Sequence, residues 1–167
     1  MIPSRLISGF LVVLSALALP ACYGFAGGGL PAEIKTVAVL PFDNQTPEPT
    51  LTQEISRAVR EAVEQRLGLR QATEQRADAV VRGSITRYEP DLPVAYTGGD
   101  SVVTVTRREV QITVSVEIMD QRQGKPLWQR SGLTVRGNYE SGNELEGRDR
   151  ALDDLVVNIV EGAQSQW

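Results

Sequence analysis

The segment EVQITVSVEI, residues Glu109–Ile118, alternates polar and apolar side chains without a break. Successive side chains of a β-strand point to opposite faces, so this period of two predicts a strand with one buried face and one polar face. The apolar residues are Val110, Ile112, Val114, Val116 and Ile118, and the polar ones are Glu109, Gln111, Thr113, Ser115 and Glu117. We expect the strand to run from Val102 to Asp120, in a sheet that is covered on one face only.

Two further strands are expected beside this one. Gln121–Lys125 has the composition of a hairpin turn, and a return strand follows it from Leu127 to Tyr139. The segment Ala77–Tyr88 is predicted to be the preceding strand of the same antiparallel meander. Pro90–Asp100, which lies between them, contains two prolines and Gly98-Gly99, so we interpret it as a loop.

The first half of the domain is predicted to be a strand followed by a helix. Lys35–Phe42 is apolar and rich in β-branched residues, which is typical of a buried strand, and Asp43–Pro49 is a turn-rich loop. Thr50 with Gln53 three residues later predicts a capping box at the start of the helix. Apolar residues then recur at steps of three and four until Gly68, which occupies the position of a C-cap.

The order of elements predicts the fold class. Residues 69–75 form a short connection or an edge strand, and a last helix with one apolar stripe spans about Glu146–Gln164. The order β-α-β-β-β-α predicts an α+β fold, a two-layer sandwich with two helices packed on one face of a mixed four-stranded sheet. The two strands that flank the first helix should be parallel if they are neighbours. We expect a single domain over residues 34–167.

The N-terminal segment is typical of a bacterial lipoprotein. After Arg5, an apolar run reaches Leu19, and it is shorter than the ~20 residues that span a bilayer. Leu19-Pro20-Ala21-Cys22 matches a lipobox, in which the cysteine thiol takes a diacylglycerol and the signal is cut before that residue. We expect a signal peptide over 1–21, lipidation of Cys22 and a glycine-rich tether over 22–33. An ordinary cleaved signal followed by an incidental cysteine is the alternative.

Composition argues against several classes of function. The chain carries 17 Lys and Arg against 21 Asp and Glu, whereas a general nucleic-acid binder is usually basic. It has no histidine, which is the commonest general base and metal ligand, and its single cysteine cannot form an intrachain disulfide. We expect no enzymatic activity, no metal and no cofactor other than the lipid on Cys22. Only a carboxylate site for a hard cation stays conceivable.

A series of short motifs extends over the mature chain. They are Cys22-Tyr23-Gly24-Phe25, Leu30-Pro31, Lys35–Val39 with Phe42 and Asn44, Leu51-Thr52-Gln53, Ala77–Tyr88, Tyr139 and the closing Trp167. Their order resembles that of the LptE family, although the family usually opens with Gly-Tyr where this chain has Tyr23-Gly24.

The resemblance implies a function without catalysis. Members of the LptE family sit as a plug in the β-barrel translocon LptD, assist the assembly of that barrel and help to deliver lipopolysaccharide to the outer leaflet. The residue after Cys22 is Tyr23 and not Asp, which in enterobacteria favours retention in the inner membrane. We therefore expect a lipid-anchored protein on the periplasmic face of the outer membrane.

Basic residues are the candidates for contact with lipopolysaccharide, since the resemblance links its binding to such residues. By alternation, Arg82, Arg130 and Arg136 share the polar face of the sheet, and Arg107 and Arg108 adjoin the 90–100 loop. A guanidinium group offers phosphate a rigid fork of donors, so the phosphates of lipid A are possible ligands. The alternative is that these arginines only keep an exposed sheet soluble.

The centre of the 90–100 loop is apolar, with Leu92, Val94 and Tyr96. Small exposed apolar clusters can mark interfaces, so we expect these side chains to contact a partner. A loop folded back on its own domain is the alternative.

A second group of lipoproteins shares the string Val37–Asn44. It includes the curli-secretion lipoproteins, which form a pore, and the activators of penicillin-binding proteins. A pore-forming protein would need further segments for a transmembrane barrel, for which this chain has no spare length. A synthase activator often has a longer tether than the one expected here. Both points favour the LptE-like interpretation and leave the second one as the alternative.

Overall fold

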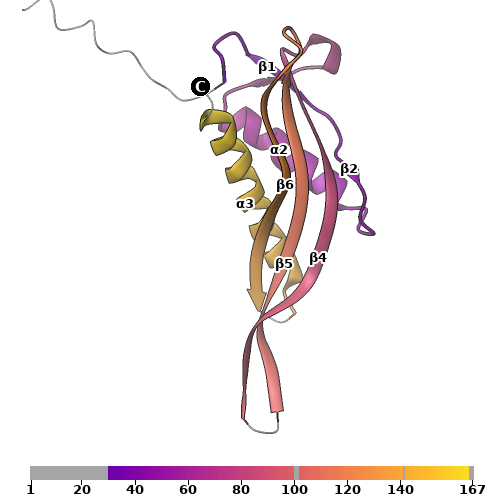
Figure 1. Cartoon of the computed structure of the whole chain (residues 1–167), viewed down its shortest axis with the longest axis vertical. Coiled ribbons are helices and arrows are strands. Elements are labelled where there is room, and N and C mark those ends of the chain that lie inside the picture. Colours follow the sequence, from indigo (N-terminus) through magenta and orange to yellow (C-terminus); the bar gives the residue numbers. More distant parts are fainter. Residues whose placement is uncertain (1–29, 100–101, 141, 166–167) are drawn as a thin grey trace, which may run out of the picture.

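The computed structural model describes residues 30–99, 102–140 and 142–165. The predicted signal peptide and Cys22 lie outside these ranges. Two helices and six strands are seen in them, together with the short 3-10 helix η1, Glu74–Arg76 (Figure 1). The strands are β1 Thr36–Val39, β2 Asp43–Asn44, β3 Arg70–Gln71, β4 Ala79–Gly99, β5 Val102–Asp120 and β6 Lys125–Glu140, and the helices are α2 Leu51–Gln65 and α3 Glu144–Ser165.

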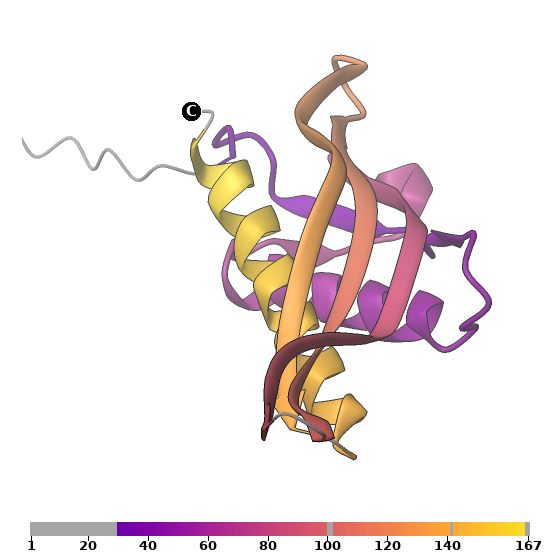
Figure 2. The same cartoon turned by 60° about the horizontal axis from the view of Figure 1, so that its bottom comes forward.

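The architecture is the predicted two-layer α+β sandwich. The sheet has the order β3-β1-β4-β5-β6, and β2 also pairs with β4. β1 is parallel to β3 and β4, as expected for the crossover through α2, while β4, β5 and β6 are antiparallel. Both helices pack on the same face of this mixed sheet (Figure 2).

The predicted number of four strands is wrong. The two additional strands, β2 and β3, are two residues long and mostly exposed, so no periodicity marks them in the sequence. β2 comes from the segment that the sequence predicts to be a loop, and it is a strand only because Asp43 and Asn44 pair with Ser84 and Ile85 of β4. β3 is the edge strand that was one of the two interpretations of residues 69–75.

The core lies between the sheet and the two helices. All five apolar residues of the alternating segment in β5 are at most 3% exposed. They meet the apolar stripes of the helices, which are represented by Leu51, Ile55 and Val59 of α2 and by Leu155 and Ile159 of α3. Leu30, within the predicted tether, already packs against this core.

The start of α2 differs from the prediction. Thr50 has helical backbone angles, φ −69° and ψ −26°, and its side chain makes no capping hydrogen bond. Its hydroxyl instead donates to Glu48 Oε1 at 2.6 Å and accepts from Arg148 Nη1 at 3.1 Å. The predicted capping box is therefore wrong, because the local partner Glu48 and the tertiary partner Arg148 occupy the hydroxyl. At the other end α2 stops at Gln65 with Arg66 as its C-cap, so the C-cap predicted at Gly68 is two residues late. Gly68, with φ +68°, lies in the turn between α2 and β3.

The predicted 90–100 loop is also wrong, because β4 continues through it to Gly99. Beyond Ile85 the part of β4 that the structure describes has no strand on its other edge, so Pro90 and Pro93 remove no ladder hydrogen bond there. Three of the register shifts between β4 and β5 fall between Glu89 and Tyr96, and they let the strands continue past the prolines.

The ends of β4 and β5 form a two-stranded projection, which we call the arm. It comprises residues 93–99 and 102–106. Its base is formed by Pro93 and Ala95, which pair with Arg108 and Arg107 at the end of the β5–β6 ladder, and beyond them β5 pairs with β4 alone. The arm extends past the body at one end of the long axis, close to the start of α3 (Figure 1). The first described residues and the end of α3 lie at the opposite end (Figure 1).

Candidate functional site

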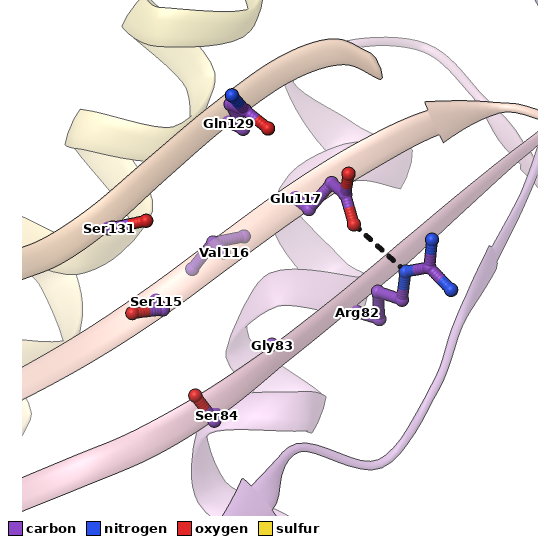
Figure 3. Close-up of a pocket in the computed structure, with 8 residues that line it drawn as sticks. All are labelled: Arg82, Gly83, Ser84, Ser115, Val116, Glu117, Gln129 and Ser131. Carbon is purple, nitrogen blue, oxygen red and sulfur yellow. Dashed lines mark hydrogen bonds and ion pairs between the residues drawn. The ribbon is translucent and has the colours of Figure 1, made fainter. Parts of the chain in front are cut away.

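The sheet face away from the helices, called here the outer face, is uncovered over much of β4, β5 and β6. It contains a shallow hollow of about 340 Å³, which Arg82, Ser84, Ser115, Glu117 and Ser131 help to line (Figure 3). The small serine side chains leave room between the longer ones. The outer face is therefore a polar surface with open space for a ligand or a partner.

Cross-strand pairs organise the outer face. Arg82 Nε donates to Glu117 Oε2 at 3.0 Å, and Gln129 follows Glu117 in register on β6 (Figure 3). Farther along, the hydroxyl oxygens of Thr113 and Thr134 lie 3.1 Å apart. Each of these cross-strand pairs joins either opposite charges or two hydroxyl groups, so the outer face is polar without an excess of positive charge.

Two of the predicted arginines lie on the outer face with a carboxylate partner. Arg82 pairs with Glu117, and Arg136 Nε lies 3.4 Å from Glu109 Oε1 and 3.3 Å from Gln111 Oε1. Both arginine side chains are more than half exposed. A phosphate that approached either arginine would have to compete with the paired carboxylate for the guanidinium group.

The prediction that Arg130 shares this face is wrong. Arg130 is in register with Val116, which is 3% exposed in the core, and directly opposed residues share a face of the sheet. A register shift between Val114 and Val116, with Gly132 at φ +65°, inserts an extra residue into β6. Alternation counted through this bulge therefore gives the wrong face.

The pair at the base of the arm is divided between the two faces. Arg107 follows the alternation of β5 to the outer face. It also helps to line a hollow of about 680 Å³ together with Glu140 of β6 and Arg150 of α3. Arg108 points to the helix side and forms an ion pair with Asp91. The five predicted arginines thus occupy separate places and form no single cluster.

The three predicted partner-contact residues lie in β4 near the base of the arm. Tyr96 is 57% exposed and Val94 is 44% exposed, whereas Leu92 is half-buried. The alternative of a loop folded back on the domain does not describe Val94 and Tyr96, because both side chains are open to solvent.

A buried polar network at the base of the arm is absent from the prediction. Arg148 of α3 is 9% exposed and contacts Glu54 Oε1 at 3.3 Å and Glu144 Oε1 at 3.0 Å. Its guanidinium carbon lies 5.4 Å from the ring centre of Tyr88, whose hydroxyl donates to Glu144 at 2.7 Å. Arg148 stands three residues before Ala151 on the apolar stripe of α3, and a charge on such a stripe is the signal that could have identified it.

A second tyrosine holds the other side of the arm's base. The Tyr139 hydroxyl donates to the Pro90 carbonyl at 2.7 Å and lies 3.2 Å from Asp91 Oδ1. Burial raises the pKa of Tyr139 and that of Tyr88, and a hydrogen bond to a carboxylate contributes to the rise in each case. Both phenols are therefore protonated donors at neutral pH.

The described residues contain no group of three or more His, Cys, Asp or Glu side chains that is arranged to hold a metal ion. None of the helices in those ranges is both long and apolar enough to cross a membrane.

Comparison with known proteins identifies the family. The model of the LptE family, which is described as lipopolysaccharide-assembly, matches residues 34–162. The chain belongs to the LptE family. The resemblance seen in the sequence motifs is thereby confirmed, and the protein is placed among the lipopolysaccharide-assembly lipoproteins. Among curated proteins, none matches this chain.

Solved structures share the fold at low sequence identity. A PelC dodecamer from Paraburkholderia phytofirmans has a TM-score of 0.53 at 19% identity, covering 82% of this chain and 94% of that one. A protein from Xanthomonas campestris has a TM-score of 0.55 at 11% identity, with coverage of 83% and 90%. An uncharacterized lipoprotein B from Nitrosomonas europaea has a TM-score of 0.50 at 12% identity, with coverage of 83% and 86%. These likenesses establish the fold alone.

Proposed function

We propose that this protein is an outer-membrane lipoprotein that is anchored through Cys22 and partners a β-barrel translocon of the LptD type. In this role it acts as a plug and assembly factor while lipopolysaccharide passes to the cell surface, and it catalyses no reaction. The observation that carries the proposal is the LptE-family match, which extends over residues 34–162 and so includes both layers of the domain.

The outer face supports a position inside a barrel. The interior of a large outer-membrane barrel is polar, so a plug needs a polar surface with few unbalanced charges. The pairs Arg82–Glu117 and Arg136–Glu109 meet this requirement, because each exposes a charge beside its opposite. Serine and threonine side chains between them can donate and accept hydrogen bonds with either polar side chains or water.

Affinity purification from bacterial envelopes tests the partnership. A tagged copy of the full chain should recover one large outer-membrane β-barrel in near-stoichiometric amount after mild detergent extraction. Recovery of a penicillin-binding protein or of a large homo-oligomer, without a barrel, would instead favour the alternative among the curli-secretion and synthase-activator lipoproteins.

The lipid anchor is tested by one substitution. Cys22 is the only cysteine in the chain, so Cys22→Ser removes the acyl acceptor without affecting any disulfide. A palmitate label should be present on the wild type and absent from this variant. A label that persists in Cys22→Ser would contradict the anchor.

Lipopolysaccharide contact is proposed for the arginines of the outer face, which are Arg82, Arg107 and Arg136. Arg130 lies on the other face of the sheet and carries the same charge, so it supplies a matched control. Arg136→Glu should weaken lipopolysaccharide binding to the isolated domain several-fold, while Arg130→Glu leaves it unchanged. Equal effects of the two variants would show that only net charge matters.

A further inference from the structure

Exposed apolar side chains gather at one end of the molecule. Four large apolar residues in the described ranges are substantially exposed, namely Val94 at 44%, Tyr96 at 57%, Leu145 at 67% and Val157 at 37%. Val94 and Tyr96 belong to β4 in the arm, and Leu145 is in the first turn of α3, which begins at the same end (Figure 1). Only Val157 lies away from this end, in the second half of α3.

The arm is held in place at its base. Tyr139 donates to the carbonyl of Pro90 at 2.7 Å, and Tyr88 donates to Glu144 of α3 at 2.7 Å. Arg108 adds an ion pair with Asp91. An isolated two-stranded ribbon is marginally stable in water, so these contacts are needed to keep the arm at a fixed angle to the body. A surface that is preorganised in this way loses less conformational entropy when it binds.

The charge at this end favours a protein over an anionic lipid surface. The two hollows beside the arm are lined by the carboxylates of Asp91, Glu140, Glu144 and Glu146 and by the guanidinium groups of Arg107, Arg108 and Arg150. A segment that binds anionic lipid headgroups carries a clear basic excess, which is missing here. Exposed aromatic and aliphatic side chains with polar groups of balanced charge beside them are instead typical of a protein interface.

The position of the arm also separates it from the predicted anchor. Leu30, the first described residue, is eight residues after Cys22, and this length of chain extends to at most about 29 Å. β4 has 21 residues, so at about 3.3 Å per residue its contour length from its start to the end of the arm is at most roughly 69 Å. The arm thus projects away from the end at which the chain leads to the lipid.

Recognition at the arm depends on side chains more than on strand pairing. Beside its free edge β4 contains Pro90 and Pro93, and three register shifts against β5 distort the same part of the strand, so a regular ladder with an added strand is disfavoured. Tyr96 offers a large side chain with little rotamer entropy to lose, and such residues dominate the binding energy of interfaces.

We propose that the arm end, which consists of Val94, Tyr96, Leu145 and the hollows beside them, is the surface that docks on the partner barrel, with Tyr96 as its main anchor. This inference rests on the proposed function, since it names the part of the domain that binds the partner of that function. The occupant is a protein wall with an apolar recess for the Tyr96 ring and polar groups that face the hollows.

Quantitative recovery of the barrel from envelopes tests the surface. We compare the full-length wild type with Tyr96→Ala and Leu145→Ala, and we use Val157→Ala as a matched control because it truncates an exposed apolar residue of α3 outside the arm end. Tyr96→Ala should reduce recovery of the barrel at least about 10-fold and Leu145→Ala about 3-fold, while Val157→Ala leaves recovery within about 2-fold. All three residues are exposed, so the thermal midpoints should stay equal.

The outcomes separate this inference from the function on which it rests. If the wild type recovers no barrel, the proposed function fails. If the wild type recovers the barrel and Tyr96→Ala recovers as much, only the arm-end surface is refuted. A third measurement uses vesicles of phosphatidylethanolamine and phosphatidylglycerol with the Cys22→Ser protein. Flotation that depends on Tyr96 would assign the arm to lipid and overturn the choice of a protein partner.

Discussion

Gly137 of β6 and Gly147 of α3 let the terminal helix approach the sheet closely. A Cβ atom at position 137 would lie 1.8 Å from the Gly147 carbonyl oxygen and 2.7 Å from the Ala151 amide nitrogen. Both are backbone atoms of a helix, so no side chain can rotate away. Gly137→Ala therefore forces α3 outward by more than about 1 Å, which is a large displacement in a close-packed interior.

The expected loss in the free energy of unfolding follows from the side chains that α3 buries. The helix places Ala151, Leu155 and Ile159 against the sheet, each with no exposed surface, and an outward shift loosens all of these contacts. Overpacked cores lose typically 1–3 kcal/mol, and a clash between two backbones belongs at the upper end, so we expect Gly137→Ala to cost about 3 kcal/mol. That is a substantial part of the ~5–15 kcal/mol by which domains are stable.

Urea unfolding followed by circular dichroism measures this loss. The control is Gly162→Ala, whose Cβ would meet the Trp128 ring at 2.4 Å. An indole side chain can shift where a backbone cannot, so this variant should lose only about 1 kcal/mol. If Gly137→Ala unfolds within about 0.5 kcal/mol of the wild type, the close approach of α3 to β6 is not as described.

Three further predictions concern polar groups of the domain. Arg148→Met should cost about 2 kcal/mol in urea unfolding, because Glu54 and Glu144 lose their buried partner but remain partly solvated; an unchanged midpoint would contradict the network. Tyr139→Phe should cost about 1–2 kcal/mol and speed amide exchange around Pro90, whereas unaltered exchange would show that the hydroxyl does not hold the arm. The hydrogen bond with Thr36 lowers the pKa of Asp78, so its contribution to stability is present above the unfolded value of ~3.9 and is lost as the pH falls toward the lower folded value. Asp78→Asn should flatten the stability profile below about pH 4, and an equally steep profile would exclude this role.

Local patterns predicted those parts of the molecule in which one face of one element meets the core. The alternation in Glu109–Ile118 identified the buried set of β5, and helical spacing identified the stripes of α2 and α3. Gly68 marked the end of α2 to within two residues, at a position after the C-cap Arg66 where the chain takes a positive φ. The family resemblance likewise came from short motifs in order, which sequence alone contains.

The features that the sequence predicted wrongly or missed depend on contacts between different elements. The bulge at Gly132 reversed the face of Arg130, and no local signal counts the extra residue in β6 because the count is made against β5. Pro90 and Pro93 argued for a loop, yet β4 has a free edge where they occur, and an edge is defined only by the neighbours of a strand. Tyr88, Arg148 and Glu54 come together from three separate elements.

The sequence by itself thus determined the two helices and the main strands, their buried faces, the family and the expectation of a lipid on Cys22. Only the tertiary structure decided that the 90–100 segment is an arm, that the predicted arginines lie on different faces, and that a buried network clamps the base of the arm. The physical reason is that periodicity reports how one element meets the core. Register, edges and polar networks depend instead on pairing between residues that are far apart in the chain.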